Sequence, residues 1–201
     1  MVESPECWLV VSVTTAGAAA ALRVHVWRKL KSLGALYVQQ SVCLLPARPG
    51  VVQQVNRLRD RVQHQGGSVR VLRMQFTDPD EEASVIGEFN AARDEEYGEV
   101  LERIPALRQE LAAERGRGRA TYAEVEESEA DLDRFRAWLA KITARDYFAA
   151  ATGSAAQAAV AEAAADLAAF EQTALAADSS VAVAVAVAVA RGGRLRAVPR
   201  P

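Results

Sequence analysis

The sequence predicts an α+β fold: a ferredoxin-like βαββαβ sheet, then a long antiparallel helical hairpin, then a low-complexity Ala/Val-rich tail. Short apolar runs rich in β-branched residues alternate with amphipathic stretches up to Thr77, a pattern typical of alternating strands and helices. Two helix-start signals follow, at Asp78 and Thr121, and each precedes a long segment of helical periodicity. From Ala149 onward alanine dominates, which marks low complexity.

These changes set the predicted boundaries. Residues 1–148 form one domain, with a ferredoxin-like part over residues 1–77 and a helical hairpin over residues 78–148. Residues 149–201 are predicted to be a low-complexity extension, not a second folded domain, because large apolar side chains are scarce in them.

The first half of the sheet is predicted from four segments. Residues 7–13 (CWLVVSV) form a continuous apolar run typical of a buried strand. Residues 18–33 carry leucine and valine at three- and four-residue spacing, which predicts a helix that Gly34 ends. Residues 36–39 and 42–45 then read as two short strands of a hairpin.

The second half repeats the pattern. Apolar residues at helical spacing between Val51 and Val62 predict a second helix, which the Gly66-Gly67 pair ends. A fourth strand is expected from Val69 to Phe76. The order βαββαβ is the ferredoxin-like arrangement, with two helices on one face of a four-stranded sheet. Many functions share this fold, so the order alone does not indicate one.

The helical hairpin and the tail have their own signals. Pro105 is expected to break or kink the first long helix, because proline lacks a backbone donor. Residues 116–119 (GRGR) mark the reversal, and Thr121 with Glu124 forms a capping box for the next helix. Five Val-Ala repeats over residues 181–190 predict a strand with two apolar faces.

Charge divides unevenly along the chain. Residues 1–77 contain ten Lys/Arg and three acidic residues, whereas residues 78–148 contain ten Lys/Arg and nineteen acidic residues. A basic half beside an acidic half indicates a polyanionic partner or docking of one half on the other.

Two cysteines, Cys7 and Cys43, both lie in apolar strand patterns. They fit buried free thiols and no metal-ligand spacing. The N-terminus has no signal-peptide pattern and no run is long enough for a membrane helix. We therefore expect a cytoplasmic protein without membrane contact.

One arginine lies on an otherwise apolar helical face. Arg93 shares its stripe with Phe89 and Tyr97, and an antiparallel hairpin brings it near Asp146. Because an unpaired buried charge is very costly, we expect Arg93 to pair with Asp146. The cluster is either a structural clamp or an anion site for a tetrahedral oxyanion. Its candidate members are Asn90, Arg93, Asp94, Tyr97, Arg145 and Asp146.

Cations on the two predicted sheet helices are candidate DNA-binding residues. A solvated charged face, phosphate binding and docking on the acidic hairpin remain open as interpretations, and cations that touch phosphates add affinity without sequence choice. No helix-turn-helix or zinc pattern is visible. The candidates are Arg23, Arg28, Lys29, Lys31, Arg57 and Arg61.

Catalysis has little support in the sequence. His25 and His64 have no serine or cysteine at a recognisable spacing, and the end of the first predicted strand, residues 12–15, carries no carboxylate that would anchor a metal. No glycine-rich phosphate loop is present. We expect neither an enzyme nor a bound metal or cofactor.

Several segments carry a family resemblance. They are CWLVVSV, RVHVWRKLKSLGA, YVQQSVCLLP, FNAARDEEY and ITARDYF, between Trp8 and Phe148. In this order they resemble the N-terminal domain of the ChrB chromate-resistance regulators, a relative of ferredoxin-like CRISPR-associated nucleases.

The resemblance implies a chromate-responsive transcriptional regulator, or an accessory protein of a chromate-resistance operon, that binds DNA through its basic residues. We also expect a homodimer. Because the alanine-rich tail stands where relatives carry a sensing domain, we expect the chain either to work with a separate chromate-sensing partner or to be a standalone relative. The alternative is a protein-interaction or dimerisation module that does not bind DNA.

Overall fold

The computed structural model describes residues 7–17, 19–117 and 121–192, with the backbone alone for residues 177–192. Contacts divide the chain into two compact units. The sheet unit comprises Met1–Glu96 and Lys141–Gly153, and the helical unit comprises Tyr97–Ala140 and Ser154–Pro201. The sequence-based boundaries at residues 77 and 148 remain predictions about domains.

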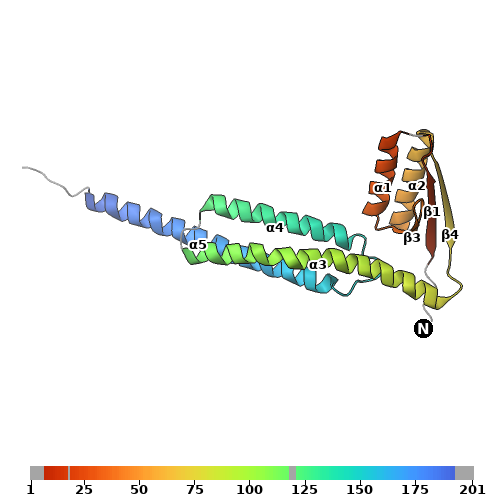
Figure 1. Cartoon of the computed structure of the whole chain (residues 1–201). Coiled ribbons are helices and arrows are strands. Elements are labelled where there is room, and N and C mark those ends of the chain that lie inside the picture. Colours follow the sequence, from red (N-terminus) through yellow and green to blue (C-terminus); the bar gives the residue numbers. More distant parts are fainter. Residues whose placement is uncertain (1–6, 18, 118–120, 193–201) are drawn as a thin grey trace, which may run out of the picture. The chain divides into compact units, whose positions relative to one another are not determined.

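The sheet unit contains the four-stranded antiparallel sheet that the sequence predicts, in the order β2-β3-β1-β4. The helices α1 and α2 lie on one side of it (Figure 1). The fold class is therefore confirmed as α+β with a ferredoxin-like sheet. The elements are β1 (Trp8–Thr14), α1 (Ala20–Ser32), β2 (Leu36–Gln39), β3 (Val42–Pro46), α2 (Pro49–His64) and β4 (Ser68–Met74).

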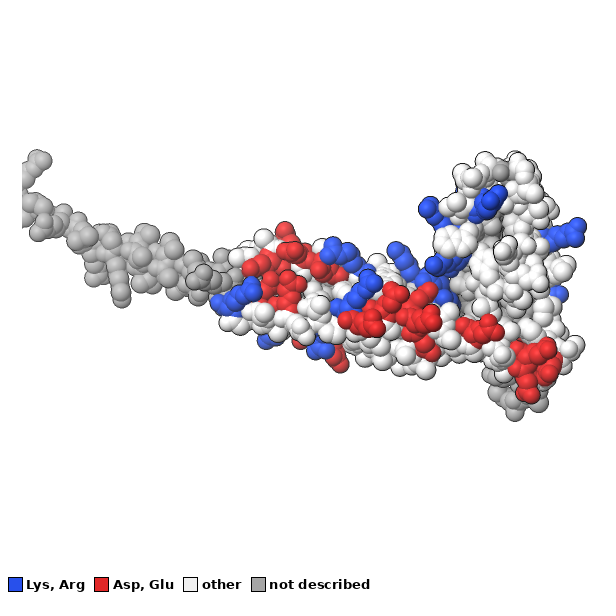
Figure 2. Space-filling model, viewed as in Figure 1, with Lys and Arg blue, Asp and Glu red and all other residues white. Residues whose placement is uncertain are grey.

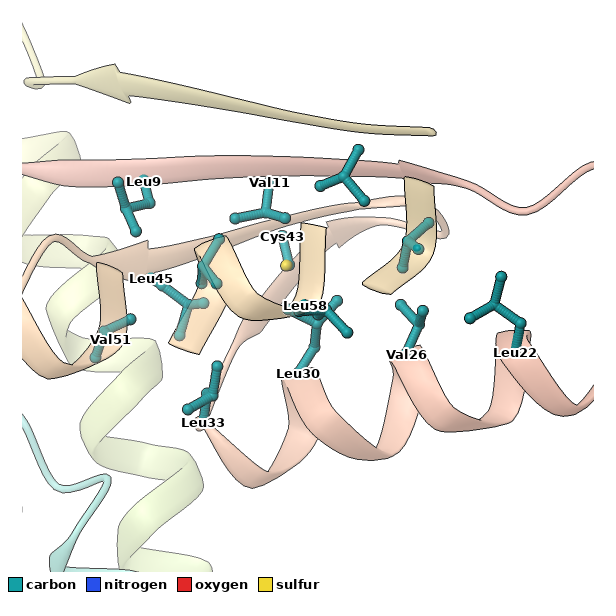
Figure 3. Packing of buried hydrophobic residues seen from close by; sticks show 13 residues of the cluster. Leu9, Val11, Leu22, Val26, Leu30, Leu33, Cys43, Leu45, Val51 and Leu58 are labelled. Carbon is teal, nitrogen blue, oxygen red and sulfur yellow. The ribbon is translucent and has the colours of Figure 1, made fainter. Parts of the chain in front are cut away.

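The core of the sheet unit lies between the sheet and these two helices. Alternation along β1 sends Leu9 and Val11 toward the helices, where both are at most 1% exposed. Leu30 of α1 and Leu58 of α2 come from the other side and are equally enclosed (Figure 3). Each such side chain contributes about 1.5–3 kcal/mol when it leaves water, so this core holds the helices on the sheet.

An aromatic cluster closes the start of β1. The Trp8 ring is fully buried, and its centroid lies 5.7 Å from those of Phe76 and Phe89 and 5.5 Å from that of Phe148. The indole Nε1 donates a hydrogen bond to Glu82 at 2.7 Å, which satisfies the polar atom that a buried tryptophan brings. The cluster joins β1 to the first turns of the next helix and to residue 148.

Three long helices complete the described part of the chain: α3 (Pro79–Arg117), α4 (Tyr122–Thr143) and α5 (Gly153–Gly192). The predicted capping box is confirmed, because Thr121 N donates to Glu124 at 2.8 Å and Glu124 N donates to Thr121 Oγ1 at 3.3 Å. Of the predicted reversal at residues 116–119, residues 118 and 119 lie outside the described part, as do residue 120 and residues 193–201 of the tail.

Two sequence-based predictions about these helices need correction. The break expected at Pro105 does not occur, since α3 is continuous from Pro79 to Arg117, and the kink that was its alternative stays a prediction. Ile104 and Leu107 on either side of Pro105 are at most 4% exposed, so packing offsets the lost hydrogen bond. Residues 181–190 are helical within α5, not a strand. The preceding alanine-rich segment has the highest helix propensity, and extending an existing helix costs less than starting one.

Within the helical unit, buried stripes and charged contacts join the helices. The apolar stripe predicted on α3 continues through Tyr97 and Val100, both fully buried. Arg108 of α3 contacts Glu162 at 2.5 Å and Asp166 at 2.7 Å on α5. Among the described residues, no helix is both long enough and apolar enough to cross a membrane.

The cysteines permit a test of this packing. Burial beneath the sheet raises the pKa of Cys43 to about 12. Only the thiolate reacts, so at pH 8 about 10⁻⁴ of the molecules present a reactive Cys43. A Cys7→Ser variant should take up no thiol reagent at pH 8 when folded and one equivalent in guanidinium. Rapid stoichiometric labelling of the folded variant would contradict the position of Cys43.

Candidate functional site

The carboxylate of Glu96 binds two arginines in the sheet unit. Arg93, one turn earlier on α3, donates from Nη2 to Oε1 at 3.1 Å. Arg145, just beyond α4, donates to Oε2 from Nη2 at 2.7 Å and from Nε at 3.2 Å. The Arg93 side chain is 8% exposed, and those of Arg145 and Glu96 are 18% and 24% exposed. We call these three residues the arginine–glutamate bridge.

Gly34 makes room for this bridge. It follows α1 with φ +70°, a left-handed geometry that glycine adopts without strain. A Cβ at this position would lie 2.8 Å from Nη1 of Arg93 and 3.0 Å from Cβ of Arg145. The glycine therefore has two roles, since it ends α1 and lets two arginines approach its backbone.

Residues 144–152 are held against α1 and α3 by further hydrogen bonds. The Tyr147 hydroxyl donates to the carbonyl of Leu33 at 2.8 Å, at the end of α1. Asn90 of α3 donates to the carbonyl of Phe148 at 3.5 Å. Burial raises the pKa of Tyr147 above its usual value, so the phenol stays protonated and able to donate at neutral pH.

The two aspartates of the predicted cluster bind backbone groups. Asp94 accepts hydrogen bonds from Thr152, at 2.6 Å from Oγ1 and 2.8 Å from the backbone nitrogen. These hydrogen bonds lower the pKa of Asp94, so the stability they add is present above the usual carboxyl pKa and is lost as pH falls through the lowered value. Asp146 accepts from the backbone nitrogen of Ala150 at 3.0 Å.

The predicted pairing of Arg93 with Asp146 is therefore wrong in its partner. The turn beyond α4 does bring Arg145 and Asp146 to the part of α3 that carries Arg93, as the hairpin predicts. The carboxylate that meets Arg93 is Glu96, three residues along the same helix. Residues three apart on a helix are neighbours on its surface, and this spacing was the available signal for Glu96.

The arrangement favours the structural interpretation of the cluster over an anion site. The Glu96 carboxylate lies between the two guanidinium groups, where an oxyanion would otherwise bind. Nε and Nη1 of Arg93 have no hydrogen-bond partner among the described residues, yet both are buried, and Nη1 lies against Gly34. The remaining candidate, Tyr97, is fully buried and belongs to the helical unit.

A basic hollow lies between α1 and α2. Its volume is about 260 Å³, and Lys29, Arg57 and Arg61 line it together with His25, Gln54 and Leu58. The Lys29 ammonium donates to the Gln54 side chain. Burial is the main cause that lowers the pKa of His25, and the charges of Arg61 and Lys29 lower it further, because each disfavours the charged imidazole.

The structure thus brings three of the six candidate DNA-binding residues together in the basic hollow. Arg28 and Lys31 are exposed elsewhere on α1, and Arg23 lines a different cavity. Figure 2 shows Lys and Arg side chains on the sheet unit and a mixture of acidic and basic side chains over the long helices.

That second cavity has a volume of about 560 Å³ and lies beside the exposed side of α1. This cavity was not predicted from the sequence. Tyr37 was missed, and the only sequence signal was an aromatic residue in a short edge strand. The lining residues are Val13, Thr15, Arg23, Val24, Val26, Trp27, Leu30, Tyr37, Gln40 and Ser41.

Among the described residues, no group of three or more His, Cys, Asp or Glu side chains is placed to hold a metal ion. The acidic residues near the arginine–glutamate bridge are engaged by arginine, threonine or backbone groups.

The fold and these surfaces define a ferredoxin-like sheet unit that carries a basic hollow and an aromatic cavity. Residues 23–181 match the family described as "Protein ChrB, N-terminal". The chain therefore belongs to the ChrB N-terminal family.

One curated relative, Protein ChrB of Cupriavidus metallidurans, is 31% identical over 110 residues. That match covers 54% of this chain and 33% of the relative, so the chain spans about a third of the relative's length. No solved structure gives a significant match.

The arginine–glutamate bridge predicts a large effect of one neutral substitution. Glu96→Gln removes the charge that two partly buried guanidinium groups share, and breaking a buried pair costs about 3 kcal/mol. The free energy of unfolding, measured by urea denaturation, should fall by that amount. The control is Glu99→Gln on the same helix, whose partner Arg103 is exposed and whose loss should cost under about 0.5 kcal/mol. Equal effects in the two variants would contradict the bridge.

Gly34 predicts a contrast between two glycine substitutions. Gly34→Ala combines a left-handed φ with a clash against two arginines, and should lower the free energy of unfolding by about 2 kcal/mol. Gly87→Ala on α3 meets nothing within 4 Å and should raise it by up to about 1 kcal/mol, since alanine favours helix. Thermal and urea unfolding measure the change in both variants. If Gly34→Ala leaves the free energy of unfolding unchanged, the two arginines do not approach residue 34 closely.

Proposed function

We propose that this protein is a regulatory or accessory protein of a chromate-resistance operon, and that it binds DNA through the basic surface of its sheet unit. The observation that carries the proposal is the basic hollow, where Lys29, Arg57 and Arg61 converge from two helices. Family membership supports the link to chromate resistance. We propose a cytoplasmic, non-catalytic role, with chromate response through this chain or through a separate sensing partner.

The distribution of charged residues supports a polyanion as the partner. Residues 1–77 carry ten Lys/Arg against three acidic residues. Arg57 and Arg61 are exposed around the hollow, and Lys29 lines it with them. Three cations that converge in one hollow attract phosphates, of which a DNA duplex carries one negative charge per about 1.7 Å.

The contacts expected from this surface are with phosphates. Lys and Arg side chains that touch only phosphates hold a protein in place on DNA, but they do not read the bases. Specificity for an operator would then come from DNA shape or from a second copy of the chain in a homodimer. Affinity should depend strongly on salt, because each neutralised phosphate releases counterions.

Substituting the three cations of the hollow tests the proposal. The full chain should bind a duplex from upstream of its own gene with a dissociation constant below about 1 μM at 50 mM salt, a range open to phosphate-contacting proteins at low salt. The triple variant Lys29→Gln, Arg57→Gln, Arg61→Gln should weaken binding at least about tenfold. It should also reduce the slope of log K against log salt by about 2.7, or 0.9 per lost contact.

The matched control is the triple variant Arg134→Gln, Arg136→Gln, Lys141→Gln, which removes the same charge from exposed positions on α4. It should bind like the unchanged protein. If both triple variants lose the same affinity for the duplex, the effect comes from net charge and the hollow is not the DNA-binding surface. Binding that ignores salt, or that is absent at 50 mM salt, would overturn the proposal.

One observation favours the alternative, a dimerisation module that does not bind DNA. Leu72 of β4 pairs with Val10 on the sheet face opposite the core and is 62% exposed. A large apolar side chain on an uncovered face is a feature of interaction surfaces. Sedimentation equilibrium with and without duplex separates the two functions, because a salt-insensitive dimer without DNA affinity supports only the alternative.

A further inference from the structure

The cavity beside α1 has features that DNA phosphate contacts do not require. Its volume of about 560 Å³ falls within the range of about 300–1,000 Å³ that small-molecule sites occupy. Apolar side chains of β1 and α1 line it, namely Val13, Val26 and Leu30. The cavity is therefore large enough for a small ligand and is lined in part by apolar side chains.

Two aromatic rings flank this cavity, and both are unusually exposed. Trp27 of α1 is 51% exposed and Tyr37 of β2 is 38% exposed. Exposed apolar side chains that gather around one hollow and are rimmed by polar residues are a feature of binding sites. The Lys31 ammonium lies over the Trp27 ring, 5.2 Å from its centroid, so a cation covers one face of the more exposed of the two rings.

The polar groups of the cavity are suited to a nucleotide. Arg23 supplies a guanidinium that can bind a phosphate. Gln40 and Ser41, in the turn between β2 and β3, and Thr15, after β1, supply neutral donors and acceptors of the kind that hydrogen-bond to base edges.

We propose that this cavity binds an unpaired base of single-stranded DNA, which stacks on Trp27 and Tyr37 while its phosphate meets Arg23. Charge complementarity commits the cavity to this occupant. Arg23 lines the cavity and the Lys31 ammonium lies over the Trp27 ring, so cations are placed to meet the phosphates of a strand whose base enters the cavity. Aromatic platforms beside a basic groove are the means by which proteins hold single strands. The inference rests on the proposed DNA binding and adds the class of DNA.

The test compares binding of a dT12 oligonucleotide and a 12-base-pair duplex to the full chain, by fluorescence anisotropy at 50 mM salt. Trp27→Leu should weaken dT12 binding about tenfold, since one stacked base contributes a factor of about 5 to 150, and should leave duplex binding unchanged. Trp27→Phe keeps a ring and should retain most of the dT12 affinity. Tyr37→Leu is a second variant with the same expected selectivity, and Trp138→Leu in the helical unit is the control that should change neither affinity.

The outcomes separate the inference from the proposed function. Duplex binding without dT12 binding, or dT12 binding that Trp27→Leu leaves unaltered, overturns the inference and leaves the proposed function standing. If the unchanged protein binds neither dT12 nor the duplex, both the inference and the proposed function are overturned. If dTMP binds as tightly as dT12, the cavity is a site for a free nucleotide. If an apolar peptide displaces the base of dT12 from the cavity, the cavity is a site for a protein strand. Either result overturns the assignment to single-stranded DNA.

Discussion

The carboxylate of Glu96, held between Arg93 and Arg145, is the interaction on which the sheet unit depends. A guanidinium group that leaves water loses its hydration and must recover that energy from a nearby anion. One carboxylate does this for two arginines that come from different segments, α3 and the turn after α4. The contact is possible because Gly34 leaves no side chain in the way, so the end of α1 is fixed by the same group of residues.

The consequence reaches the surfaces proposed for function. Tyr147 lies in the turn that Arg145 anchors, and its hydroxyl donates to the carbonyl of Leu33 at the end of α1. The helix α1 carries the basic hollow on the side of Lys29 and the aromatic cavity on the side of Trp27. A fixed helix holds cations and rings at constant spacing, which lowers the entropy lost when a ligand binds. Exposed pairs such as Arg103 with Glu99 offer no comparable constraint, because solvent screens them.

Sequence periodicity was enough to predict the sheet unit. Alternating and helical patterns located β1 to β4 and both sheet helices within a few residues, because each element buries one regular face. It failed where tertiary packing opposed local propensity, as at Pro105, and where alanine-rich helix continued through residues 181–190. For the site, the stripe pattern indicated that Arg93 is buried and lies near Arg145. It predicted Asp146 as the partner of Arg93 where the structure has Glu96, since side-chain direction at a chain turn depends on backbone angles that no pattern encodes. The cavity was not predicted, because it joins Trp27 to Tyr37 across two elements.

A double-mutant cycle between Glu96 and Arg145 tests the central interaction most directly. The free energies of unfolding of Glu96→Gln, Arg145→Gln and the double variant give the coupling energy of this pair alone. The account predicts a coupling of about 1–3 kcal/mol, the range for residues in one charged network, and one that changes little between 0.1 and 1 M salt because the pair is largely shielded from solvent. A coupling indistinguishable from zero would show that the two residues do not interact and that the sheet unit is held together in another way.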